Sequence, residues 1–173
     1  MNEIVWVYGV SAAGKETFIK KMVNDKPFSV VEGLGWDTKN IIPCMESIEY
    51  VVQVAGDGNE QKRHLLPTII KTLDESNTDS VILIKGQDLD LRADRITQTK
   101  ILIPQATHRI LFIDTPIDAV YERVQNKKWW TGIHPKEELL NWEKNQKNFL
   151  RTLQGDFEIT IINHEYEIVG SVL

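Results

Sequence analysis

The chain has 173 residues, of which 42% are hydrophobic and 26% are charged, a balance typical of one soluble globular domain spanning 1–173. Its formal net charge of −5 argues against a dedicated duplex nucleic-acid binder, and its single cysteine excludes an internal disulfide and a cysteine-based zinc site. No apolar run approaches the ~20 residues of a membrane span, and the first residues lack a signal-peptide pattern, so we expect a cytoplasmic protein without a membrane partner.

The chain begins with a predicted buried strand over residues 3–8, followed directly by a glycine-bounded loop. In a phosphate-binding loop of this kind, successive backbone N–H groups surround a phosphate, and the N-terminus of the next helix adds partial positive charge. Lys15 is placed to reach the β- and γ-phosphates of a nucleotide. The residues that we predict to bind the nucleotide are Gly9, Ser11, Ala12, Ala13, Gly14, Lys15, Glu16 and Thr17.

The residue after the loop lysine departs from the usual pattern. A hydroxyl normally follows the lysine and binds magnesium, whereas this chain has Glu16 there and Thr17 one position later. In one interpretation, the match is accidental and Glu16 is a first-turn acid stabilised by the helix dipole. In the other, the loop is a variant form and Thr17 takes part in the metal site.

Hydrophobic periodicity predicts strands and helices that alternate along the whole chain. Thr115 is expected to cap one helix, with Pro116 at its first position. Five alternating strands indicate a parallel sheet with helices on both faces, and ligands then bind at the carboxyl ends of the strands. The predicted strands cover 3–8, 29–32, 81–84, 109–113 and 157–162, and the predicted helices cover 14–24, 46–55, 65–73, 89–99, a segment beginning at 115–116, and a long segment from 135 to about 153.

Two segments resemble the P-loop kinase superfamily, specifically its adenylate-kinase-like group. The loop at 9–17 has the G-K-x-T form of that group, and residues 108–128 contain the similar run RILFIDTPIDAVYERVQNKK. The resemblance covers nearly the whole chain in layout. It implies a three-layer P-loop NTPase fold with a five-stranded parallel sheet, ATP and Mg²⁺ as cofactors, and a small lid segment at about 126–135.

The resemblance also implies roles for individual residues. In that family, a helix arginine and basic lid residues contact the transferring phosphoryl group, which here points to Arg123, Lys127 and Lys128. The alternative is a solvated basic cluster at a helix C-terminus. Asp37, after the second predicted strand, matches an acid that orients or deprotonates the acceptor hydroxyl, unless it is an ordinary turn aspartate.

The end of the predicted strand 81–84 departs from the family. Related kinases place a magnesium-holding acid there, but this chain has Lys85. Asp88 or Asp114 could replace that acid. Gln87, Asp88 and Arg92 stand where substrate contacts are expected, although a capped surface helix would show the same pattern.

These observations favour an ATP-dependent kinase that acts on a nucleotide, a nucleoside or another small acceptor. One alternative is a non-catalytic nucleotide-binding module, motivated by Glu16 and Lys85. Another is a polynucleotide 5′-end kinase, which the acidic composition disfavours. A switch GTPase is also disfavoured, because residues 126–129 lack the aspartate of a guanine-reading N-K-x-D motif.

Overall fold

The computed structural model describes residues 3–22, 28–29, 42–43, 81–85, 90–126 and 136–171. Most predicted elements within these ranges are confirmed, with boundaries shifted by one to three residues. The elements in chain order are β1 (Glu3–Tyr8), α1 (Lys15–Met22), β2 (Phe28–Ser29), β3 (Ile42–Pro43), β4 (Val81–Lys85), α3 (Asp90–Leu102), β5 (Thr107–Asp114), α4 (Ile117–Gln125), α5 (Lys136–Leu153), β6 (Glu158–Asn163) and β7 (Ile168–Gly170).

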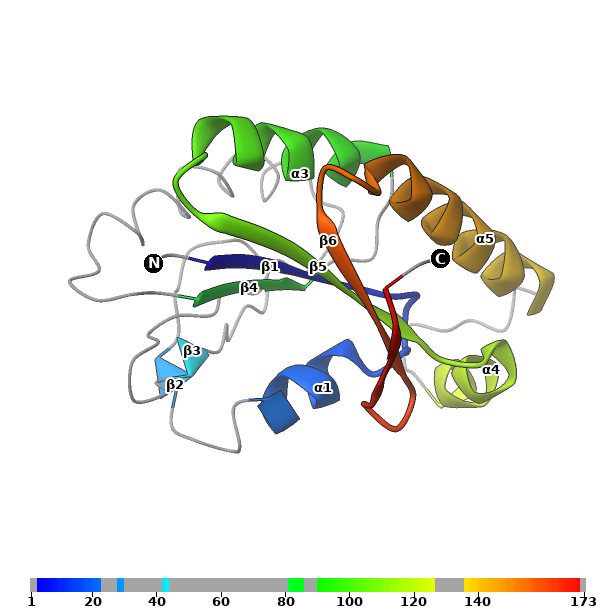
Figure 1. Cartoon of the computed structure of the whole chain (residues 1–173). Coiled ribbons are helices and arrows are strands. Elements are labelled where there is room, and N and C mark those ends of the chain that lie inside the picture. The colour runs from blue at the N-terminus through cyan, green and yellow to red at the C-terminus, as the bar shows by residue number, and fades with distance from the viewer. Residues whose placement is uncertain are drawn as a thin grey trace.

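The main sheet has the strand order β4-β1-β5-β6-β7 (Figure 1). Strands β4, β1, β5 and β6 run parallel, and the register places Tyr8 of β1 beside Phe112 of β5. Because parallel strands end at the same edge, the loops after β1 and β5 are neighbours. This register brings the glycine-bounded loop next to the segment that follows Asp114.

The expectation of five parallel strands is not confirmed. The described sheet has four parallel strands, and its fifth member, β7, is antiparallel to β6. Strand β7 has only three residues and follows a tight turn, so its sequence is too short to show a strand period. Of the strand expected at 29–32, Ser29 belongs to β2, which pairs with β3 in a separate two-stranded sheet, and residues 30–32 lie outside the described part.

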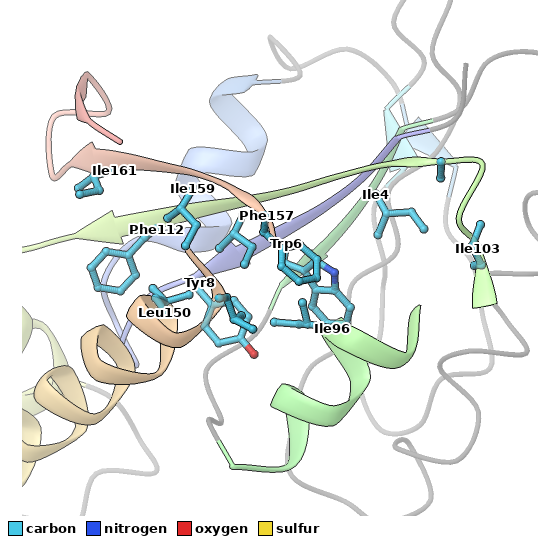
Figure 2. Close-up of a cluster of buried hydrophobic side chains, with 13 residues drawn as sticks. Ile4, Trp6, Tyr8, Ile96, Ile103, Phe112, Leu150, Phe157, Ile159 and Ile161 are labelled. Carbon is cyan, nitrogen blue, oxygen red and sulfur yellow. The ribbon is translucent and has the colours of Figure 1, made fainter. Parts of the chain in front are cut away.

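Alternate residues of the central strands face two separate cores. On one face, Trp6 and Tyr8 pack with Ile96 of α3 and Leu150 of α5 (Figure 2). On the other face, Val5 and Val7 belong to a cluster with side chains of α1 and α4. Helices α3 and α5 therefore cover one face, while α1 and α4 cover the other (Figure 1). This arrangement confirms an α/β fold with helices on both faces.

His108, the second residue of β5, lies at the edge of the first core. Its Nε2 is 2.8 Å from the Ile103 carbonyl oxygen, and its ring meets the Phe157 ring edge-on. Burial lowers the pKa of His108, and the Lys100 charge acts in the same direction, although the hydrogen bond to Ile103 opposes both. The neutral imidazole is therefore the form that suits this position.

None of the described helices is both long enough and apolar enough to cross a membrane. The predicted helices at 46–55 and 65–73 lie outside the described residues, and so do residues 127–135 of the expected lid.

Candidate functional site

The backbone of the loop between β1 and α1 adopts conformations that favour glycine. Gly9 has φ +154° and Gly14 has φ +102°, while Ala12, with φ +61°, is a non-glycine residue in the left-handed region. A Cβ atom on Gly9 would lie 3.0 Å from the Ile113 carbonyl oxygen, so a side chain there would crowd β5. The loop is thus tightly turned and pressed against the neighbouring strand.

Helix α1 begins immediately after this loop, so its first backbone N–H donors lie beside the loop. The Phe18 N–H donates to the Gly14 carbonyl at 2.9 Å, which makes Gly14 the residue that precedes the first turn. The first N–H groups of α1 therefore lie at the loop. Such N–H groups, together with the helix dipole, bind anions, and phosphate above all.

Lys15 adds a full positive charge to the same place. Its side chain is only 6% exposed, and its ammonium donates to the carbonyls of Gly9 at 2.6 Å and Val10 at 2.7 Å. A buried ammonium is retained only where it has such oxygen partners. The lysine therefore reaches across the loop from the start of α1, and its charge lies at the carbonyls of the first loop residues after β1.

Two side chains from the β5–α4 segment hold the outer, carbonyl side of the loop. The Thr115 hydroxyl, 2% exposed, donates to the Ala13 carbonyl at 2.7 Å. Nη1 of Arg123 donates to the carbonyls of Ala12 and Ala13, at 3.2 Å each. The expectation that Thr115 caps α4 is wrong: Pro116 occupies the N-cap position, with no side-chain cap, because the threonine hydroxyl is directed at the loop instead.

Tyr166, in the turn between β6 and β7, reaches the same loop from the end of the chain. Its hydroxyl donates to the Gly14 carbonyl at 3.5 Å, and its ring lies 5.7 Å from the Phe18 ring of α1. Asn163 secures the turn, because its side-chain oxygen accepts from the N–H groups of Glu165 and Glu167. Sequence reasoning missed Tyr166, since no local pattern links it to a loop about 150 residues earlier.

Asp114, a candidate replacement for the missing metal-holding acid, has a cationic partner in this structure. The Asp114 carboxylate lies 2.9 Å from the Lys147 ammonium, which also pairs with Glu143 at 2.9 Å. Partial burial by itself would lower the pKa of Lys147, but its hydrogen bonds to these two carboxylates and their charges raise it. Among the described residues, no group of three or more histidine, cysteine or acidic side chains could hold a metal ion.

The structure brings Arg123 to the predicted loop, but it leaves several predicted site residues undescribed. Arg92 lies in the first turn of α3 and Glu16 in the first turn of α1, and their side chains are not described; Thr17 is exposed. The roles of all these residues remain predictions. The predicted acceptor-binding and lid residues outside the described part are Asp37, Gln87, Asp88, Lys127 and Lys128.

The sequence matches no protein-family model and no curated protein. The structure, however, is similar to shikimate kinase from Bacteroides thetaiotaomicron, with a TM-score of 0.51, 13% identity, and coverage of 94% of this chain and 86% of that one. It is also similar to deoxyadenosine kinase from M. mycoides, with a TM-score of 0.51, 13% identity, and coverage of 95% and 92%.

A third similar structure comes from the PezAT chromosomal toxin–antitoxin system of Streptococcus pneumoniae. Its TM-score is 0.55 at 14% identity, and the match covers 98% of this chain and 72% of that one. At these identities the likeness concerns the fold. Together with the glycine-bounded loop after β1 and the parallel order β4-β1-β5-β6, it shows that this chain has the fold of the P-loop kinases.

Proposed function

We propose that this protein is an ATP-dependent phosphotransferase that uses Mg²⁺ and acts on a small hydroxyl or phosphate acceptor. The observation that carries this proposal is the site at the start of α1. There a buried lysine, a tightly turned loop and the N-terminus of a helix meet. The names of two similar structures, a shikimate kinase and a deoxyadenosine kinase, support a small acceptor.

In the proposed reaction, an acceptor oxygen forms a bond to the γ-phosphorus of ATP as the bond to the β-γ bridging oxygen breaks. ADP leaves with that electron pair. Lys15 and the N–H groups at the start of α1 hold the phosphates. Arg123, which in this structure donates to the Ala12 and Ala13 carbonyls, is our proposed cation for the transferring group, on the strength of the family resemblance. Asp37 would accept the proton of an acceptor hydroxyl.

The residues present fit a nucleotide better than they fit a bound metal by itself. Buried cationic and N–H donors suit polyphosphate, whereas the described residues offer no cluster of metal-binding side chains. We therefore assign Mg²⁺ to phosphate oxygens and water, with Thr17 and Asp88 as its proposed protein contacts; when bound, the ion would neutralise phosphate charge. Gln87, Asp88 and Arg92 are our proposed acceptor contacts, and Lys127 and Lys128 our proposed lid bases.

A non-catalytic nucleotide-binding module is the second candidate. The pairing of Asp114 with Lys147 favours it, because it occupies one of the two acids proposed to replace the acid absent at Lys85. Such a module would bind ATP without turning it over. The single cysteine agrees with a reducing cytoplasm as the location in either case.

A coupled ADP-release screen over nucleosides, nucleotides, sugars and 5′-hydroxyl oligonucleotides tests the proposal. We expect turnover with one acceptor class, and a fall on the order of 10²–10³ in kcat/KM in Lys15→Ala, because that variant loses the buried phosphate-binding charge. Lys144→Ala, which removes an exposed lysine of α5, is the matched control and should keep full activity.

Three other outcomes of the screen have definite meanings. ATP binding without turnover on any acceptor would favour the binding module. Activity confined to 5′-hydroxyl oligonucleotides would favour a polynucleotide kinase. Absence of ATP and GTP binding in the presence of Mg²⁺ would refute the assignment of the loop.

A further inference from the structure

The carbonyl side of the phosphate-binding loop has donors that come from elsewhere in the fold. The hydroxyl of Thr115 holds the Ala13 carbonyl, and the hydroxyl of Tyr166 contacts the Gly14 carbonyl. We propose that these two hydroxyl groups are positioning elements that set the affinity of the loop for polyphosphate. The proposal rests on the function proposed above, but it concerns residues that do not touch the nucleotide.

The geometry of the peptide bond connects these carbonyls to the phosphate side. The Ala13 carbonyl and the Gly14 N–H belong to one peptide unit, and in a trans peptide the two groups point in opposite directions. A hydrogen bond that pulls the Ala13 carbonyl outward therefore turns the Gly14 N–H inward, toward the concave side of the loop. The Gly14 carbonyl already accepts from the Phe18 N–H at 2.9 Å, so the contact with Tyr166 at 3.5 Å adds a second, weaker restraint on the peptide that carries the N–H of Lys15.

The hydrogen bonds from Thr115 and Tyr166 are needed because one residue of the loop has an unfavourable backbone conformation. Ala12 lies at φ +61°, a conformation that costs a non-glycine residue energy and persists only where its surroundings enforce it. The Ala13 N–H is already committed to the Val10 carbonyl at 3.1 Å. The neighbouring Ala13–Gly14 peptide is thus the unit whose orientation depends on donors outside the loop.

Thr115 makes the stronger of the two hydrogen bonds. Its hydroxyl is almost fully buried and lies 2.7 Å from its acceptor, whereas the Tyr166 hydroxyl is half-buried and lies 3.5 Å away. Arg123 also donates to the Ala13 carbonyl, but at 3.2 Å and from an exposed side chain. Loss of the Thr115 hydroxyl therefore leaves a longer and weaker restraint on this peptide.

The test measures binding of two probes, Mg·ATP and Mg·triphosphate, by calorimetry at a temperature where every variant is folded. Thr115→Val removes the hydroxyl and keeps the shape, and we expect its Kd for both probes to rise about five- to tenfold. Thr115→Ser restores the hydroxyl and should bind within about twofold of the wild type. Tyr166→Phe should weaken binding about twofold, because its contact is long.

Thr99→Val is the matched control. It makes the same chemical change at an equally buried threonine of α3, on the opposite face of the sheet, and should leave both Kd values unchanged. A merely structural role for Thr115 would lower the melting temperature of Thr115→Val without changing its Kd. Rescue by serine in the Kd is therefore the diagnostic result.

The outcomes separate this proposal from the proposed function. Wild-type protein that binds neither probe refutes both. Wild-type protein that binds both probes, with Thr115→Val binding equally well, refutes only the positioning role. If Thr115→Val cannot be obtained folded, Tyr166→Phe decides the matter, and an unchanged Kd in that variant overturns the proposal.

Discussion

Replacing Gly14 with alanine tests the geometry of the loop most directly. Gly14 has φ +102°, and a Cβ atom there would lie 2.8 Å from the Tyr166 hydroxyl and 3.5 Å from Nη1 of Arg123. Gly155, after α5, offers a matched comparison, because it has φ +94° and nothing lies within 4 Å of the position of its Cβ. Gly155→Ala therefore isolates the cost of the backbone conformation, and Gly14→Ala adds a steric contact.

The backbone cost for alanine at a positive φ is about 1–2 kcal/mol and should be similar at both positions. The contact with the Tyr166 hydroxyl adds roughly 1 kcal/mol at Gly14, the lower end of overpacking costs, because the end of a half-buried side chain can shift. We thus expect losses of about 1–2 kcal/mol for Gly155→Ala and about 2–3 kcal/mol for Gly14→Ala.

Urea unfolding of both variants measures these losses, and the double variant Gly14→Ala/Tyr166→Phe assigns the extra cost. Without the hydroxyl, the nearest Tyr166 atom would be Cζ at 3.6 Å, an ordinary van der Waals distance, so the double variant should regain most of the extra loss. ATP affinity should fall in Gly14→Ala and stay unchanged in Gly155→Ala. Equal destabilisation of the two single variants, or no recovery in the double variant, would show that the loop does not lie against Tyr166 as described.

Three further predictions concern the two cores and the end of β5. The Thr99 hydroxyl is fully buried and has no hydrogen-bond partner among the described residues. Thr99→Val should therefore raise the free energy of unfolding by about 1 kcal/mol in urea titrations. A lower free energy of unfolding in the variant would mean that the hydroxyl makes a hydrogen bond. Burial lowers the pKa of His108, so the imidazole binds a proton more readily in the unfolded chain than in the folded protein. Wild-type stability should therefore fall as the pH drops below 6.5. Thermal melts from about pH 7.5 to about pH 5 should show a flatter pH profile for His108→Gln. Lys147→Met should lower the free energy of unfolding by about 1 kcal/mol, because Asp114 and Glu143 lose their partly exposed cationic partner. A variant as stable as the wild type would show that these two ion pairs contribute nothing to stability.

Several parts of the candidate site are predictable from the sequence because their signals are local. The apolar run of β1, the glycines at 9 and 14 and the lysine in the first helical turn lie within about a dozen consecutive residues. Strand and helix periods, together with the conformational demands of glycine, act over such distances. Strands β4 and β5 are predictable for the same reason, since each contains a continuous apolar run, and β6 is predictable from its three isoleucines within four residues.

Other features could not be predicted, because they depend on which segments meet in space. The hydroxyl of Thr115 had two possible partners: it could accept from an N–H in the first turn of α4 or donate to a loop carbonyl. Only the register of β5 beside β1 decided for the loop. In the same way, no local pattern in the sequence indicates that Lys147 of α5 pairs with Asp114 at the end of β5. In both cases the partner of the side chain belongs to a segment that is distant along the chain.

By itself, the sequence determined that a strand, a glycine-bounded loop and a helix with an early lysine stand at the start of an α/β chain. The tertiary structure alone decided that Thr115, Arg123 and Tyr166, which lie 102 to 152 residues beyond their acceptors, close around the carbonyls of that loop. The reason is physical: backbone conformation responds to neighbouring residues, whereas a hydrogen bond between distant segments exists only after the sheet has aligned them.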